Sequence, residues 1–228
     1  MKRSRTSLFC LFVSALVLLP QFCRAQEKET ARRVIPAVSF YVSGDYFSPN
    51  FKDVNAVYGT LGQVYSLPDG KDFKDYYTLN GGLKISPVEQ QTIRLEASVS
   101  LYKSQLGTPI YNTKSINFLQ MYYGGATYLV NFPFGRTAFF IGAGPGYVRL
   151  NTQRTYSDRA GVVRVNGNLF QLHATGGVDF YQSSGVAFGL EIGYAYATTP
   201  YTRSADLDFT LKGVTGGISI TVPLVNSL

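Results

Sequence analysis

The stretch from Gly185 to Thr198 most constrains what this chain can fold into. Large residues (Val, Phe, Leu, Ile, Tyr, Tyr) occupy one parity, while Gly, Ala and a single acid, Glu191, occupy the other. A period of two is that of a β-strand. In a soluble sandwich the non-core face would carry long polar side chains to meet water. A face of Gly and Ala instead favours a narrow closed barrel whose large residues face lipid and whose small residues fill the interior.

The remainder of the chain repeats this pattern seven times. We expect strands at 37–47, 76–86, 92–102, 116–131, 137–150, 169–180, 185–198 and 209–222. The apolar residues of 116–131 do not share one parity, which indicates a β-bulge. Long connections, at roughly 48–75, 103–115, 151–166 and 199–208, alternate with short turns. This pattern predicts an all-β fold, an eight-stranded antiparallel up-and-down transmembrane β-barrel with short periplasmic turns and long outer loops.

The first 25 residues have the parts of a secretory signal peptide. A basic start precedes an apolar run at 8–19 and the small-residue pattern Cys23-Arg24-Ala25, so we expect cleavage after Ala25. The apolar run is shorter than the ~20 residues of a spanning helix. Both cysteines leave with the signal, so the mature chain has no thiolate for catalysis or metal binding. We expect a flexible periplasmic lead at 26–36 and the barrel domain at 37–228.

The basic character of the chain does not indicate a nucleic-acid partner. The net charge of +7 includes four cations in the signal region, without which 17 cationic residues face 14 acidic ones. The sequence shows no basic stripe interleaved with aromatic residues, so we expect no nucleic-acid binding.

Six ionisable residues share the inward parity of their strands: Lys84, Arg94, Glu96, His173, Asp179 and Glu191. An unpaired ion in such an interior is costly, so these residues need partners. We expect a salt-bridged structural plug in the lumen rather than a catalytic carboxylate or a proton path. We accordingly predict no catalytic residue, no cofactor and no metal site.

The one histidine offers an alternative. In the run His173-Ala174-Thr175, the histidine and the threonine share a strand face, which could set a hydroxyl beside a base. Lipid A deacylases use a His-x-Ser pair on a barrel, whereas here Thr replaces Ser and the face points inward. A hydrolase acting on lipid or lipopolysaccharide, with His173 as base, therefore stays as the second hypothesis.

The mature chain resembles the small outer-membrane β-barrel domain family, the OmpA-like and OmpX-like eight-stranded barrels. The most similar runs are Gly-Ala-Gly-Pro-Gly-Tyr at 142–147 and Gly-Leu-Glu-Ile-Gly-Tyr at 189–194. The resemblance implies the architecture and a location in the cell outer membrane of a Gram-negative bacterium. Two departures are the lack of a peptidoglycan-binding domain after the barrel and a last strand without the terminal aromatic that the assembly machinery reads.

These features together predict a monomeric outer-membrane barrel with a side-chain-filled lumen. Its expected role is structural, or surface interaction through the long loops. Its expected partners are outer-membrane lipids, the outer-membrane assembly machinery and an extracellular ligand. A third hypothesis is a soluble periplasmic lipocalin-like barrel, which requires the large residues to face inward.

Overall fold

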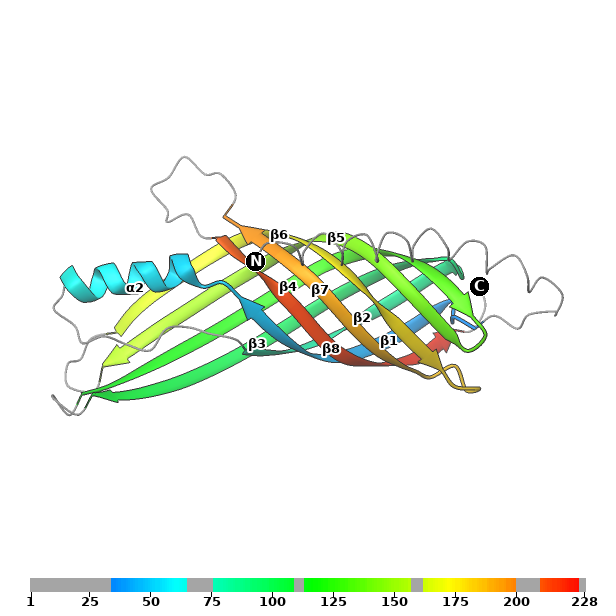
Figure 1. Cartoon of the computed structure of the whole chain (residues 1–228), viewed down its shortest axis with the longest axis horizontal. Coiled ribbons are helices and arrows are strands. Elements are labelled where there is room, and N and C mark those ends of the chain that lie inside the picture. Colours follow the sequence, from blue (N-terminus) through cyan, green and yellow to red (C-terminus); the bar gives the residue numbers. More distant parts are fainter. Residues whose placement is uncertain (1–33, 65–75, 109–112, 157–161, 200–209, 226–228) are drawn as a thin grey trace, which may run out of the picture. The chain divides into compact units, whose positions relative to one another are not determined.

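The computed structural model describes residues 34–64, 76–108, 113–156, 162–199 and 210–225. The predicted signal peptide and residues 26–33 of the predicted lead lie outside this part. Eight antiparallel strands pair in chain order and close into a barrel, with β8 pairing to β1 (Figure 1). The strands are β1 (Val38–Pro49), β2 (Tyr76–Val88), β3 (Gln91–Thr108), β4 (Thr113–Phe134), β5 (Thr137–Tyr156), β6 (Val162–Tyr181), β7 (Ala187–Thr198) and β8 (Thr210–Val225). The predicted eight-stranded up-and-down barrel is confirmed.

The large residues of the strands face outward and the small residues face the lumen, as the alternation predicts. On β7 the outward side chains of Phe188, Leu190 and Ile192 are 48%, 52% and 64% exposed, whereas the inward Ala195 and Ala197 are buried. The lumen of an eight-stranded barrel is too narrow to hold a large side chain at every inward position. Gly and Ala therefore occupy many of the inward positions, and bulky side chains occupy the others.

Strands β3 to β6 are longer than the sequence predicts. Thr108 pairs with Thr113 and Thr155 pairs with Val162, so most of the predicted loops 103–115 and 151–166 is paired strand. At the end of the long connections, the last pair between β2 and β3 is Thr78 with Ser100, and the last pair between β6 and β7 is Phe170 with Thr198. The two central hairpins therefore continue beyond their neighbours.

The predicted bulge in 116–131 is wrong. The register of β4 against β3 is unbroken from Gln91–Val130 to Thr108–Thr113. Phe118, Tyr122 and Tyr128 face outward, while Leu119 and Met121 face inward and are buried. The apolar residues occupy both parities because the inside of β4 is itself apolar at this end, where a helix fills the lumen.

That helix, α2 (Lys52–Val64), lies in the predicted loop 48–75, whose residues 65–75 are outside the described part. Asn50 caps its start by accepting a hydrogen bond from the backbone N–H of Lys52 at 3.0 Å. Asp53 in the first turn accepts one from the N–H of Thr210 on β8 at 3.0 Å. Among the described residues, no helix has the length and apolarity needed to cross a membrane.

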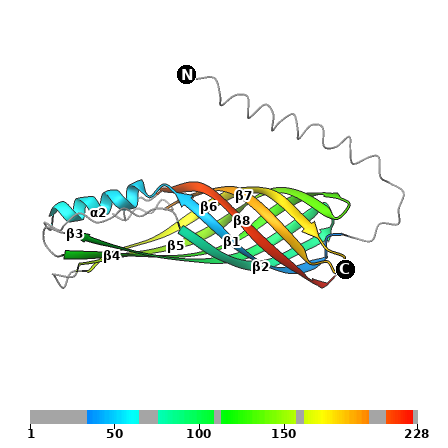
Figure 2. The ribbon, with the colours of Figure 1, turned by 60° about the horizontal axis from the view of Figure 1, so that its bottom comes forward.

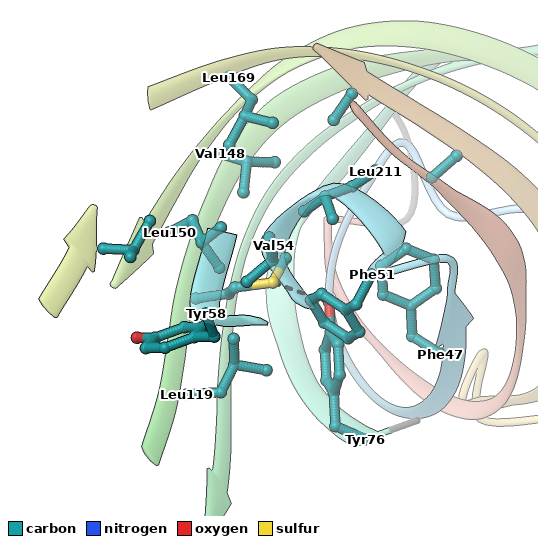
Figure 3. Packing of buried hydrophobic residues seen from close by; sticks show 14 residues of the cluster. Phe47, Phe51, Val54, Tyr58, Tyr76, Leu119, Val148, Leu150, Leu169 and Leu211 are labelled. Carbon is teal, nitrogen blue, oxygen red and sulfur yellow. Dashed lines mark hydrogen bonds between the residues drawn. The ribbon is translucent and has the colours of Figure 1, made fainter. Parts of the chain in front are cut away.

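Helix α2 packs against one end of the barrel interior (Figures 2 and 3). Phe51, Val54 and Tyr58 point from the helix into a buried apolar cluster that draws on strands all around the wall. Its strand members are Phe47, Tyr76, Leu119, Met121, Val148, Leu150, Val165, Leu169, Ala195, Ala197 and Leu211. The Tyr58 hydroxyl also hydrogen-bonds Thr152 Oγ1 at 2.8 Å, and the Arg154 guanidinium lies 4.6 Å from its ring centroid. The helix therefore closes this end of the lumen.

The opposite end, where the short turns lie, is closed by the segment before β1. Ile35 is buried with Ala138, Tyr181 and Ala187. The backbone N–H groups of Val34 and Ile35 donate to Glu89 Oε1, the latter at 3.3 Å. The last residues of the predicted flexible lead, 34–36, are thus packed against the barrel.

Replacing Val54 with Asp is expected to undock α2 while leaving the barrel closed. A charge placed among buried apolar side chains costs at least ~3 kcal/mol, which raises the undocked fraction about a hundredfold. The strand ladder does not involve this residue. Limited proteolysis within 51–64 measures undocking, and the gel mobility of the unheated protein measures barrel closure.

Ala56→Asp is the matched control, because Ala56 is exposed on the same helix. Equal protease resistance of Val54→Asp and Ala56→Asp would contradict the docking.

Candidate functional site in the barrel lumen

Arg94 on β3 lies at the centre of the lumen and is 3% exposed. Its guanidinium forms a bidentate pair with Glu191 on β7, with Nη1–Oε2 and Nη2–Oε1 distances of 2.6 and 2.9 Å. Its Nε lies 3.2 Å from Glu96 Oε2. One arginine thus faces two carboxylates, and its planar fork suits the bidentate contact.

Glu96 collects hydrogen bonds from several strands. Tyr41 of β1 donates to Oε2 at 2.7 Å, and Thr127 of β4 donates to Oε1 at 2.8 Å. Tyr123, also on β4, donates to Oε1 at 3.3 Å. Thr175 of β6 donates in the same way to Glu191 Oε1, at 2.5 Å. Both carboxylates therefore have hydrogen-bond donors in addition to Arg94, as charges in a dry interior require.

Lys84 and Asp179 form a second pair towards the short-turn end. Lys84 Nζ on β2 lies 2.8 Å from Asp179 Oδ2 on β6 and 3.2 Å from Thr221 Oγ1 on β8. The ammonium group also lies 5.6 Å from the Tyr41 ring centroid and 5.8 Å from that of Phe140. This pair ties together strands on opposite sides of the barrel.

His173 is part of the central network. Its Nε2 lies 2.6 Å from Thr127 Oγ1 and 3.3 Å from Glu96 Oε1, and its Nδ1 lies 3.2 Å from the Tyr123 hydroxyl. The hydroxyls beside the imidazole are therefore those of Thr127 and Tyr123. The predicted pairing with Thr175 is wrong, because the Thr175 hydroxyl donates to Glu191 on the neighbouring strand.

The structure brings five of the six predicted lumen residues into ion pairs with one another and places the sixth, His173, 3.3 Å from Glu96 Oε1. Sequence reasoning missed a further lumen acid, Asp45 of β1, which accepts a hydrogen bond from Asn80 Nδ2. Its shared parity with Ser39 and Ser43, both buried, is the signal that could have found it. Tyr41, Tyr123 and Thr127 also lie on the inward parity of their strands, but parity alone does not predict that they hydrogen-bond Glu96 on β3.

A cavity of about 90 Å³ lies between this network and the apolar cluster under α2. Its lining includes Asp45, Arg94, Glu96, His173 and Glu191 on the polar side and Tyr76 and Met121 on the apolar side. A cavity of this size and polarity suits a few ordered water molecules. Within the described part of the chain, no group of three or more His, Cys, Asp or Glu residues could hold a metal ion.

Inward glycines make room for the Tyr123 ring. A Cβ added to Gly146 would lie 2.1 Å from Tyr123 Cε2, and one added to Gly125 would lie 2.1 Å from its hydroxyl oxygen. The ring lies over these two glycines and meets the His173 ring edge-on, with centroids 5.9 Å apart. In the Gly-rich run at 142–147, Gly146 therefore serves the packing of an aromatic side chain, whereas a Cβ at Gly142 or Gly144 would meet the backbone of β4.

Comparison with known proteins gives structural likeness alone. No family model matches the chain, and no curated protein matches its sequence. Neisserial surface protein A shares 11% identity at a TM-score of 0.48, covering 82% of this chain and 99% of that one. Ail, the attachment invasion locus protein of Yersinia pestis, shares 10% sequence identity at a TM-score of 0.43, covering 81% of this chain and 97% of that one. The outer membrane enzyme PagL shares 13% identity at a TM-score of 0.34, covering 81% of this chain and 99% of that one. The barrel assignment rests on the strand pairing itself.

Replacing Arg94 with Met is expected to lower the free energy of unfolding by about 3–5 kcal/mol, because Glu191 and Glu96 lose their countercharge in a desolvated interior. Adding Glu191→Gln should recover more than ~1 kcal/mol of this loss, since it removes one stranded charge. Urea unfolding of the purified single and double variants measures both. Strictly additive losses would contradict the pairing.

Gly146→Ala is expected to displace the Tyr123 ring and to lower the free energy of unfolding by about 1–3 kcal/mol. In a Tyr123→Leu background the same change should cost much less, because the clashing ring atoms are gone. Gly124→Ala is the control, since a Cβ there meets no atom within 4 Å. If Gly124→Ala and Gly146→Ala lower the free energy of urea unfolding by the same small amount, the Tyr123 ring does not require a glycine at position 146.

Proposed function

We propose that this protein is an integral outer-membrane barrel with a sealed lumen, whose role is structural or one of surface interaction. The observation that carries the proposal is the outer wall. Thirty large hydrophobic side chains among the described residues are exposed, from Phe40 on β1 to Val225 on β8. A soluble monomer rarely exposes apolar patches beyond a few hundred Å². A wall of this kind is stable in hydrocarbon, because closure of the barrel gives each of the eight strands a paired neighbour on both sides.

The distribution of charge supports the same proposal. The ion pairs Lys84–Asp179 and Arg94–Glu191 lie in the lumen, while large apolar and aromatic residues face outward. The soluble lipocalin-like alternative requires the reverse, an apolar interior and a hydrated outer face. The observed orientation of the two faces therefore argues against it.

The lumen is proposed to pass no solute. The apolar cluster under α2 fills one end, the Arg94 and Lys84 networks cross the middle, and the cluster around Ile35 fills the other end. A channel would need all three layers to move.

We propose a non-catalytic role for the lumen network. His173, Thr127 and Glu96 lie within hydrogen-bond range of one another, which resembles a nucleophile with its base. Thr127 is, however, completely buried and does not line the cavity. A nucleophile must be reachable by its substrate, so this arrangement supports a structural role better than lipid hydrolysis.

Interaction with a partner is proposed for the end that carries α2. Helix α2 and the extended parts of β3 to β6 lie together there, and the three short turns lie at the other end (Figure 2). In outer-membrane barrels the short turns are periplasmic, so the α2 end faces outward. We further propose that the protein is a monomer, inserted by the outer-membrane assembly machinery after signal cleavage.

Cysteine labelling of intact cells tests this topology. The chain without its predicted signal has no cysteine, so Ala56→Cys on α2 and Ser183→Cys in the β6–β7 turn each supply a single exposed thiol. A membrane-impermeant maleimide should label Ala56→Cys in intact cells. It should label Ser183→Cys only after the outer membrane is permeabilised.

The reverse pattern would show an inverted barrel. Labelling of neither thiol before permeabilisation, with the protein in the soluble fraction, would overturn the outer-membrane proposal.

A further inference from the structure

The outer wall of β4, β5 and β6 changes character at the α2 end. Phe170 and Tyr147 are the last exposed aromatic residues of this wall on β6 and β5, and beyond them the described outward positions are amides, arginines and Thr155. On β4, Gln120 lies between the exposed Tyr122 and Phe118. We call these the arginine–amide patch: Gln120, Arg149, Asn151, Arg164, Asn166 and Asn168.

Strand pairing makes this patch continuous. Asn151 pairs with Gln120 on one side and with Asn166 on the other. Arg149 pairs with Tyr122 and with Asn168. Residues that pair directly on one face lie about 5 Å apart, so the side chains form two adjoining rows across three strands.

The patch is cationic and lacks acids. Arg149 and Arg164 are exposed, as are Asn166 and Asn168. At the outward positions 118–134 of β4, 137–155 of β5 and 164–180 of β6, whose side chains the structure describes, there is no Asp or Glu. Two guanidinium groups without local counterions favour a ligand that carries phosphate groups, which the planar guanidinium binds in a bidentate manner.

The amides and the flanking aromatic suit the sugar part of such a ligand. Asn and Gln side chains both donate and accept hydrogen bonds, as sugar hydroxyls do. Tyr122 presents a 43% exposed ring beside Arg149, and its hydroxyl accepts a hydrogen bond from Gln120 Nε2. Along β6, Arg164 lies four residues from Asn168, the partner of Arg149, which separates the two arginines by about 13 Å. This separation is comparable to the length of a disaccharide with a phosphate at each end.

The neighbouring wall indicates that the ligand is anchored in lipid. Directly below the patch the same three strands expose Tyr147, Phe170 and Leu172, and then the small side chains of Ala143 and Ala174. A phosphorylated sugar that carries acyl chains would place its headgroup on the patch and its chains along this apolar wall. A soluble sugar phosphate would gain nothing from the apolar part.

We propose that the arginine–amide patch on β4–β6 binds the phosphorylated saccharide headgroup of an acylated glycolipid in the outer leaflet. The inference rests on the proposed outer-membrane location, and it adds a ligand class and a site on the wall rather than on the loops.

The test is a binding titration of the full chain in detergent micelles with fluorescent bisphosphorylated lipid A, followed by anisotropy. We expect the double variant Arg149→Gln, Arg164→Gln to raise the Kd at least about tenfold through loss of two charge-assisted contacts. Lipid A without phosphates should bind the unaltered chain at least about tenfold more weakly. Lys212→Gln is the matched control, because Lys212 is an exposed outward cation that pairs with Tyr196 on a different part of the wall, and it should leave the Kd within about twofold.

Equal Kd values for the double variant and Lys212→Gln would overturn the proposal, as would equal binding of phosphorylated and dephosphorylated lipid A. A deacylated, phosphorylated disaccharide that binds as tightly as lipid A would also overturn it, since the ligand would then be a soluble sugar phosphate. The titration uses purified protein, so it is independent of cell location, and failure of the outer-membrane proposal would appear separately in the cysteine labelling.

Discussion

The pairing of Arg94 with two carboxylates is the interaction on which the remaining structure depends. An eight-stranded lumen has no room for bulk water, so each ion inside must find its countercharge on another strand. Arg94 on β3 reaches Glu191 on β7 across the lumen, while Lys84 on β2 reaches Asp179 on β6. These contacts exist in one register only, because a shift of one residue would turn every partner to the outer face. The network therefore reinforces the strand alignment that the alternation of outward large residues and inward small residues also specifies.

The same narrowness explains the division between large and small residues. The Tyr123 ring needs the space above Gly125 and Gly146, and the Asp45 carboxylate needs the space at Gly217, where a Cβ would lie 1.8 Å from Oδ1. Small residues on the inside are thus the complement of a few large polar ones. Outside, no such limit applies, and the large residues that would crowd the lumen form the exposed apolar wall.

Alternation was sufficient to predict the barrel, the inward parity of the six ionisable residues and the outward wall, because each is a property of one strand. Alternation within one strand does not predict contacts between strands. The hydrolase hypothesis therefore paired His173 with Thr175 of its own strand, whereas the structure places Thr127 beside it. Helix α2 was missed because Gly59, Gly62 and Asn55 lower its helix propensity, although Val54, Val57, Tyr58 and Leu61 have helical spacing. The inward apolar face of β4 was read as a bulge for the same reason, since its partner is that helix.

Because the lumen is closed at both ends and crossed by ion pairs at its centre, we propose that the outside of the barrel carries the function. The outside has two parts of different chemistry: a wall that is apolar for most of its height, and an end where α2 and the extended hairpins lie together. The arginine–amide patch lies where these parts meet, on the strands that extend furthest. A ligand held there by its headgroup would steady the extended hairpins against the surrounding bilayer, because β4, β5 and β6 each contribute side chains to the patch. On this proposal, the extended strands and the polar surface on their outer face form one platform, which α2 supports from inside and the bound headgroup supports from outside.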